Sequence, residues 1–405
     1  MTKLKHPISA ILFVVPFFFF TVVIWSCTTR SSVSETEAVQ QQDTVAFIKH
    51  TVHSAFISEG VAVGDINSDG KTDILAGAYW FEAPDWTPHE IWAPVAYDYT
   101  TGYSRSFLNW AVDVNGDGHT DYINGGFPGQ DIHWYENPGD TGGHWKEYLI
   151  DTMACNESPM MADVNNDGMP DLVFGFEPTG QMVSYQMTGK GGEDAWKRVP
   201  IGAEGLPGSG KFSHGLGFGD INKDGRNDVF VREGWWEAPE NRDEVPWPFH
   251  PASLGEPASQ MYTYDFDQDG DMDVVSASAH NYGMWWHEQT DATDSLVFEP
   301  HLITDQYSQN HGVAFTDINA DGLPDLVTGK RFYAHNGKDP GGKETPYLFW
   351  FEYQRDENNR PNWTKHIIDN NSGVGLQIVT EDMNGDGKPD LVMANKKGVY
   401  YFEQK

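Results

Sequence analysis

The sequence predicts an all-β fold, a seven-bladed β-propeller whose ring is closed by its N-terminal strand. A loop of the form DxNxDGxxD occurs six times, and a seventh copy has Asp in place of Asn. The seven copies begin 45 to 65 residues apart, and each is followed by short strand-like segments. Self-similarity at such a period is the signature of repeat architectures, propellers among them. The 42 Gly, 23 Pro and abundant Phe, Trp and Tyr are typical of a compact, turn-rich β protein.

Residues 1–26 are predicted to be a lipoprotein signal peptide. Lys3 and Lys5 precede an apolar run over residues 8–25, and the sequence IWSC ending at Cys27 resembles a bacterial lipobox, in which the cysteine is lipidated after cleavage. An uncleaved membrane anchor is the alternative, since the run is long enough to span a bilayer. In both cases the chain is expected to be exported.

The mature chain is expected to have two parts, a flexible tether over residues 27–45 and the propeller over residues 46–405. The tether sequence after Cys27 lacks aromatic residues, which favours a disordered linker. These features predict a monomeric outer-membrane lipoprotein, on the periplasmic or the surface face, that contacts the membrane only through lipidated Cys27.

Net charge argues against a nucleic-acid-binding protein, and cysteine content argues against a disulfide-stabilised one. A formal net charge of −34 makes association with nucleic acid unfavourable. After removal of the signal peptide and lipidation, Cys155 is the only free cysteine, so no intramolecular disulfide can form. We therefore expect metal ions to stabilise the fold.

The seven loops are predicted to bind structural Ca²⁺, up to seven ions in total. Oxygen ligands at loop positions 1, 3, 5 and 9, with Gly at position 6 for the sharp turn, form the hard oxygen cage that calcium prefers. One such loop alone is equally well a solvated turn, but seven in register favour calcium. The predicted ligands are Asp65, Asn67, Asp69, Asp73, Asp113, Asn115, Asp117, Asp121, Asp163, Asn165, Asp167, Asp171, Asp220, Asn222, Asp224, Asp228, Asp265, Asp267, Asp269, Asp273, Asp317, Asn319, Asp321, Asp325, Asp382, Asn384, Asp386 and Asp390.

Each repeat is expected to contain four strands. One strand ends at the loop, a second follows it, an aromatic third ends near Glu (as in YWFEAP and GWWEAP), and a fourth resembles HEIWAP or KHIID. Helices, which would flank an EF-hand loop, are not predicted here. Because the chain ends after a third strand, residues 46–54 are expected to supply the missing fourth strand and close the ring, which leaves few exposed sheet edges.

These loops resemble the FG-GAP, or VCBS, repeat family, known from integrin α-chain propellers and exported bacterial proteins. The resemblance covers all seven loops, from about residue 46 to the C-terminus. It implies a seven-bladed propeller with calcium loops between the first and second strands, on one face of the ring.

The opposite face is predicted to carry the functional site. The strand starts there place Glu59, Asn109, Glu157, His214, Gln260, His311 and Gln377 around the channel mouth. Two imidazoles and two carboxylates near one axis suit a transition-metal site, so we expect Zn²⁺ or another divalent transition metal bound by His214, His311 and one or both glutamates. A single histidine at such a position is more often a hydrogen-bonded core residue.

Turns between second and third strands add acids, phenols, amides and cations to this face, a mixture suited to binding and processing a sugar. These residues are Glu177, Arg232, Glu233, His280, Asn281, Tyr282, Lys330, Arg331, Lys396 and Lys397. The repeating tryptophans of the third strands are better explained by packing between blades than by sugar stacking. His50, His89, His301 and His366 recur in the fourth-strand pattern and are expected to be structural or exposed.

Several segments, among them SHGLGFGDINKDGRNDVFVREGWWEAP and SASAHNYGMWWHEQ, are similar to the propeller domain of the fungal aldos-2-ulose dehydratase family. That resemblance implies metal-assisted dehydration of a keto-sugar. From residue type and position on this face, His280 or an uncoordinated Glu is expected to act as the base and Tyr282 or Lys330 as the proton donor to the departing hydroxyl. In that family a cupin module follows the propeller, whereas residues 46–405 are expected to contain the propeller alone. The competing hypothesis is a non-catalytic surface module that binds a glycan or a protein through the same face.

Overall fold

The computed structural model describes residues 45–290 and 296–405, and these residues form an all-β fold. The predicted signal peptide and nearly all of the predicted tether lie outside the described residues. Within residues 45–290 and 296–405, no helix is both long and apolar enough to cross a membrane.

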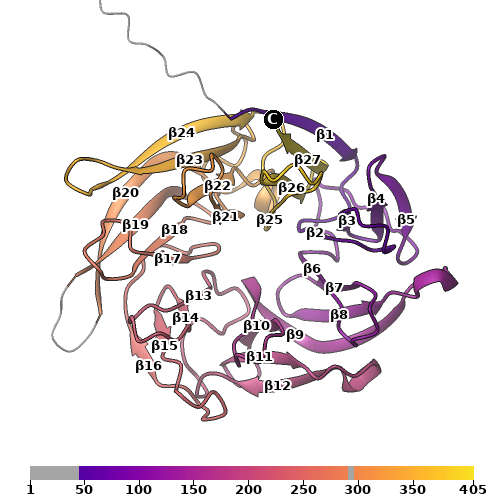
Figure 1. Cartoon of the computed structure of the whole chain (residues 1–405), viewed down its shortest axis with the longest axis horizontal. Coiled ribbons are helices and arrows are strands. Elements are labelled where there is room, and N and C mark those ends of the chain that lie inside the picture. The colour runs from indigo at the N-terminus through magenta and orange to yellow at the C-terminus, as the bar shows by residue number, and fades with distance from the viewer. Residues whose placement is uncertain (1–44, 291–295) are drawn as a thin grey trace, which may run out of the picture. The chain divides into compact units, whose positions relative to one another are not determined.

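Antiparallel sheets follow one another around a common centre, with strands such as β2, β6, β13, β17, β21 and β25 nearest to it (Figure 1). The first four-stranded sheet contains β2 (Ala62–Gly64), β3 (Asp73–Ala76), β4 (Tyr79–Glu82) and β5 (Thr87–Glu90), and a second contains β13 (Gly217–Gly219), β14 (Asp228–Val231), β15 (Gly234–Trp236) and β16 (Phe249–Pro251). The next sheet along the chain contains β17 (Tyr262–Tyr264), β18 (Asp273–Ala277), β19 (Tyr282–Thr290) and β20 (Val297–Ser308). It is followed by a sheet of β21 (Val313–Thr316), β22 (Asp325–Gly329), β23 (Leu348–Arg355) and β24 (Pro361–Asp369).

One sheet has seven strands because a single long strand is shared between two repeats. It contains β6 (Leu108–Val112), β7 (Asp121–Gly125), β8 (Gln130–Glu136), β9 (Lys146–Ala162), β10 (Asp171–Phe176), β11 (Gln181–Met187) and β12 (Trp196–Pro200). The first half of β9 pairs with β8 and its second half pairs with β10. Three short 3₁₀ helices, η1 (Gly139–Thr141), η2 (Gly192–Asp194) and η3 (Ala334–Gly337), lie in connections.

The two ends of the described chain meet in one sheet. β1 (Phe47–His53) pairs antiparallel with β27 (Gly398–Gln404), which continues to β26 (Asp390–Asn395) and β25 (Ile378–Glu381). The edge of the C-terminal hairpin is therefore covered by a strand from the other end of the chain, at the top of Figure 1.

The hydrophobic core lies mainly between neighbouring sheets. Val173 of β10, for example, shares a buried cluster with Val229 and Trp236 of the next sheet. Side-chain amides also join inner strands: Gln377 accepts the backbone N–H of Asn109 and donates to its carbonyl. Gln260 makes the same kind of bridge, accepting from the N–H of Val313 and donating to the carbonyl of Leu376.

A buried histidine makes stability depend on pH. His287 is 1% exposed, and burial, followed by the charge of His301, lowers its pKa to about 4. An unfolded histidine titrates near 6.5, so as pH falls the unfolded chain binds the proton first and acid favours unfolding. The contribution of neutral His287 is therefore present above about pH 6.5 and is lost as the pH approaches 4.

We expect the unfolding free energy of the calcium-saturated protein to fall by about 2 kcal/mol more than that of His287→Gln between about pH 7.5 and about pH 5. Urea unfolding at both pH values measures this difference. Equal losses in the two proteins would show that His287 does not govern the pH dependence.

Candidate metal centre

Four side chains from four different parts of the ring converge on one point. Glu157 lies in β9, His214 and His311 precede β13 and β21, and His280 lies in the turn between β18 and β19. One possible ligand atom from each lies within 4.8 Å of the other three. Glu157, His214 and His311 are buried, whereas the His280 side chain is 23% exposed and gives the centre its open side.

The hydrogen bonds of two imidazoles at Nδ1 direct their remaining nitrogens to the same point. Nδ1 of His214 lies 2.8 Å from the carbonyl oxygen of Phe212, and Nδ1 of His280 lies 3.1 Å from Oδ2 of Asp339. Each Nδ1–H donates to its oxygen, so in the neutral form of each ring Nε2 carries a lone pair, and the two Nε2 atoms are 2.6 Å apart. Two lone pairs at this separation need a cation between or beside them.

The carboxylate of Glu157 supplies negative charge to the same point. Its Oε2 lies 3.3 Å from Nε2 of His311 and 3.5 Å from Nε2 of His214. Burial opposes ionisation, but hydrogen bonds and charge from both histidines hold the Glu157 pKa well below its usual range. Burial also lowers the pKa of His311 well below its usual value and that of His280 to about 4. Low pKa values favour neutral imidazoles at His280 and His311 and an ionised carboxylate at Glu157, and these are the forms in which such side chains bind a cation.

Residues 330–347, between β22 and β23, fix the orientation of His280. The corresponding turn between β26 and β27 has only Lys396 and Lys397. Within the longer segment, Asp339 accepts hydrogen bonds from His280, from His335 at 2.9 Å and from Gln309 Nε2 at 3.0 Å. A carboxylate that holds the second nitrogen of a ligating imidazole sets its tautomer and raises its basicity.

Backbone strain is concentrated around this segment. Gln309, Tyr333, His335 and Asn336 all have φ between 46° and 59°, the left-handed region that residues other than glycine rarely adopt. Such strain tends to collect at functional sites, where surrounding contacts hold it in place. Neither Asp339 nor His335 was predicted, because only the unusual length of the insertion marks them in the sequence.

The structure places Glu59 outside the group of possible metal ligands (Glu157, His214, His280 and His311), which we call the metal cluster. This differs from the prediction that Glu59 could share the metal. Its carboxylate is fully buried and faces Arg331, whose Nε lies 3.6 Å away; Nη1 of Arg331 lies 3.6 Å from Glu157 on the other side. The guanidinium therefore separates the two glutamates. Burial raises the pKa of Glu59.

The three residues predicted as base and proton donors also have specific partners. His280 belongs to the group of side chains that could hold a metal ion. Tyr282 donates to Oε1 of Glu344 at the edge of the site. Lys330 is buried and donates to Ser308 and Gln309, and burial lowers its pKa to about 8.

The amide side chains predicted at the channel mouth, those of Asn109, Gln260 and Gln377, have structural roles and do not form part of a functional site. Gln260 and Gln377 join inner strands, as described above, because their amides match the unpaired backbone groups of neighbouring strands. Asn109 bonds to hydroxyls of Ser58 and Ser106 and is 1% exposed.

The acidic loops lie at the opposite ends of the same strands. In six of the seven loops, the N–H groups at positions 5 and 6 donate to the carboxylate at position 1 and the N–H at position 7 donates to the carboxylate at position 5, as in the loop that begins at Asp220. In the loop that begins at Asp265, the N–H of Asp269 donates to Asp267 instead. The Asp at position 9 is buried: Asp228 accepts from Ile221 and from Ala238 at the end of the third strand. The ligand atoms of Asp265, Asp267 and Asp269 lie within 4.8 Å of one another. An all-oxygen donor set of this kind fits Ca²⁺.

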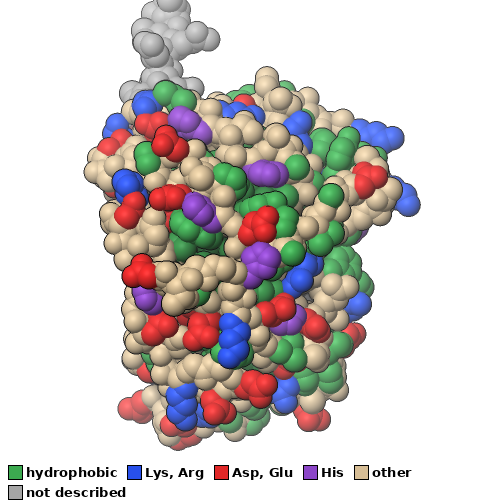
Figure 2. All heavy atoms as spheres, turned by 90° about the vertical axis from the view of Figure 1, so that its right-hand side faces the viewer, with side chains coloured by type: hydrophobic (Ala, Val, Ile, Leu, Met, Phe, Trp, Pro, Cys, Tyr) green, Lys and Arg blue, Asp and Glu red, His purple; other side chains and the backbone are tan. Residues whose placement is uncertain are grey.

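A second repeated motif connects these loops to the outer strands. In four repeats a third-strand Trp stacks on a fourth-strand His, with ring centroids 4.2 to 4.5 Å apart, and that His bonds to the third-strand Glu two residues after the Trp. The sets are Trp80, His89 and Glu82; Trp235, His250 and Glu237; Trp286, His301 and Glu288; Trp350, His366 and Glu352. Histidines next to acidic side chains are visible on the outer surface in Figure 2. These contacts agree with a structural role for the fourth-strand histidines.

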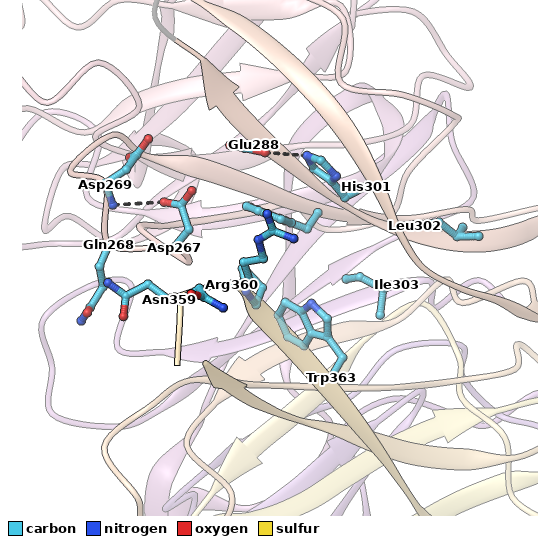
Figure 3. A pocket seen from close by; sticks show the side chains of 13 residues that line it. Asp267, Gln268, Asp269, Glu288, His301, Leu302, Ile303, Asn359, Arg360 and Trp363 are labelled. Carbon is cyan, nitrogen blue, oxygen red and sulfur yellow. Dashed lines mark hydrogen bonds and ion pairs between the residues drawn. The ribbon is translucent and has the colours of Figure 1, made fainter. Parts of the chain in front are cut away.

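A surface groove of about 770 Å³ lies between the β19–β20 and β23–β24 hairpins, away from the metal cluster (Figure 3). Its lining includes Asp267, Asp269, Arg360 and Trp363 but none of the four clustered residues. The groove lacks the convergence of buried, mutually constrained ligand atoms that distinguishes the metal cluster.

Comparisons with solved structures give distant likenesses only. A lectin from Agrocybe aegerita that recognises non-reducing terminal N-acetylglucosamine is 16% identical, with a TM-score of 0.44, over 88% of this chain and 87% of that chain. The V. cholerae biofilm matrix protein Bap1 is 12% identical, with a TM-score of 0.45, over 88% of each chain. The rhamnogalacturonan lyase YesW is 12% identical, with a TM-score of 0.44, over 86% of this chain and 71% of that chain. None of these likenesses assigns a function to this chain.

Family models give a closer relationship. A search of curated proteins found no match. The FG-GAP-like repeat model matches residues 113–174, 163–231 and 265–328, and the FG-GAP repeat model matches residues 59–84. These ranges contain six of the seven loops, all except the one that begins at Asp382. The chain therefore belongs to the FG-GAP repeat family.

Proposed function

We propose that this protein is a metal-dependent lyase that dehydrates a keto-sugar at the centre formed by Glu157, His214, His280 and His311. The observation that carries the proposal is the approach of the Nε2 atoms of His214 and His280 to 2.6 Å, with the carboxylate of Glu157 3.5 Å from Nε2 of His214. Three imidazole nitrogens and one carboxylate oxygen suit Zn²⁺ or another divalent transition metal.

The scaffold in this proposal is a seven-bladed propeller with Ca²⁺ in its seven loops. If β9 serves as the last strand of one blade and the first of the next, every blade has four strands. The pairing of β1 with β27 then joins the first and last blades. We further propose that the chain is an exported, monomeric lipoprotein anchored through Cys27.

A bound metal would polarise the sugar carbonyl and stabilise the negative charge that develops next to it. The chain's own residues would move the protons. His335 is 45% exposed, bonds through Nδ1 to Asp339 and stacks on His280, which places it to accept the proton from the carbon beside the carbonyl. Tyr282, bonded to Glu344, is placed to protonate the departing hydroxyl, so that water leaves and a carbon–carbon double bond forms.

The test is elemental analysis of the purified chain, followed by a keto-sugar screen of metal-loaded and metal-stripped protein. We expect about one transition-metal ion per chain, besides calcium, and formation of an ultraviolet-absorbing unsaturated ketone only by the loaded protein. Calcium alone, with no turnover, would overturn the lyase and favour the non-catalytic binding module.

A further inference from the structure

Aromatic side chains form two adjoining groups beside the metal centre. In one, the ring of Phe212 lies 5.9 Å from Phe127, which lies 5.5 Å from Tyr103. In the other, Tyr99 lies 5.5 Å from Tyr333. Phe212 is 53% exposed and Tyr99 is 41% exposed. We call these five residues the aromatic platform.

Contacts at Tyr103 join the two groups. The ammonium of Lys396 lies 4.1 Å from the ring centroid of Tyr103 and 6.0 Å from that of Tyr333. The backbone N–H of His335 also donates to the Tyr103 hydroxyl at 2.9 Å. The platform is therefore continuous from Phe212 to Tyr99.

The platform borders the metal centre directly. The carbonyl of Phe212 accepts the hydrogen bond that orients His214. Tyr103 lies 5.7 Å from the guanidinium carbon of Arg331, which in turn lies beside Glu157. A ligand that rests on the rings would consequently extend past the cluster on both sides.

Positive charge accumulates along the platform, in contrast to a chain with a net charge of −34. Residues 330–347 contain Lys330, Arg331, Lys338 and Lys343 against Asp339 and Glu344. Glu59 and Glu157 offset the buried Arg331 and Lys396. The cations left at least partly exposed are Lys211, over the ring of Phe212, Lys397, over the ring of Phe332, and Lys338 and Lys343.

We propose that the platform binds a linear polysaccharide that carries carboxylate or sulfate groups, and presents one of its sugars to the metal centre. Sugar rings stack on the exposed aromatic faces, and the surrounding lysines interact with the anionic groups. The proposal rests on the proposed function and specifies its substrate as an acidic polymer. Nucleic acid is the competing polyanion, and the experiment distinguishes it from an acidic glycan.

The experiment measures binding of the full mature chain, with calcium present, to immobilised polygalacturonate, alginate and chondroitin sulfate, and to neutral dextran and single-stranded DNA. We expect binding to at least one acidic glycan, weakened by salt, and weak or no binding to dextran and DNA. Phe212→Ala with Tyr99→Ala should weaken acidic-glycan binding roughly tenfold or more. Val297→Ala with Leu302→Ala, at exposed positions of β20, should have no effect.

Charge variants and a metal-site variant complete the design. Lys338→Gln with Lys343→Gln should weaken binding and reduce its salt dependence, whereas Lys223→Gln with Lys388→Gln, in the acidic loops, should not. His311→Gln should lose the transition metal but keep glycan binding, which separates failure of the metal centre from failure of this inference. Absence of binding to all three acidic glycans, equal binding to dextran, or preference for DNA would each overturn the proposal.

Discussion

Replacement of both His214 and His311 by glutamine is expected to reduce the transition-metal content from about one ion per chain to less than about 0.1 and to abolish turnover. The reason is geometric, because the two imidazoles supply half of the clustered ligand atoms and both contact Glu157. Glutamine retains much of the side-chain volume at His311, which is fully buried, so that a cavity does not confuse the result. Elemental analysis and turnover are measured on the same preparations.

The matched control is His89→Gln with His250→Gln. These histidines stack on Trp80 and Trp235 in outer strands and bond to glutamates there, outside the metal cluster. We expect the control to keep its transition metal and its activity, and both double variants to keep their calcium. A metal content that is unchanged in His214→Gln with His311→Gln would place the ion elsewhere and contradict the proposed centre.

Removal of calcium is expected to lower the melting temperature by about 10 °C or more. An ion held at a thousand times its Kd contributes about 4 kcal/mol to stability, and up to seven such ions would act on one cooperative ring. In their absence each loop holds several carboxylates close together, as Asp265, Asp267 and Asp269 show. Thermal unfolding with and without excess chelator measures the effect.

Two controls separate calcium from other effects of the chelator. Adding back excess Ca²⁺ should restore the melting temperature, whereas Mg²⁺ should restore it less, since Mg²⁺ demands a smaller octahedral site. Asp224→Ala, which removes one ligand from a single loop, should lower the calcium content by about one ion and the melting temperature by a fraction of the full effect. An unchanged melting temperature in excess chelator would contradict structural calcium.

The repeat pattern in the sequence determined the all-β fold and the family. Each DxNxDGxxD loop marks the end of one strand and the start of the next, and the aromatic segments that end in Glu mark the third strands, because β-strands and tight turns have strong local signals. The predicted pairing partner of residues 46–54 also followed from the pattern, since the last repeat lacks a fourth strand and β1 pairs with β27. The shared strand β9 was not predicted, because no turn signal distinguishes one long strand from two short ones.

The predicted starts of the strands that lead into the loops also located part of the candidate site. Glu157, His214 and His311 occupy equivalent positions in their repeats, and successive repeats bring equivalent positions to the same end of the inner strands. Whether a side chain there binds a metal or a neighbouring backbone depends on its partners. The same predicted strand starts include Gln260 and Gln377, whose amides are used to join inner strands.

The tertiary structure alone decided the composition of the metal cluster. Arg331 lies between Glu59 and Glu157 and directs only the second of them to the histidines. Within residues 330–347, Asp339 bonds to His280 and orients its ring, and His335 stacks beside it. Sequence position specifies the strand end at which a residue lies, but the direction of its side chain is set by packing and hydrogen bonds with residues from distant repeats, which the local pattern does not encode.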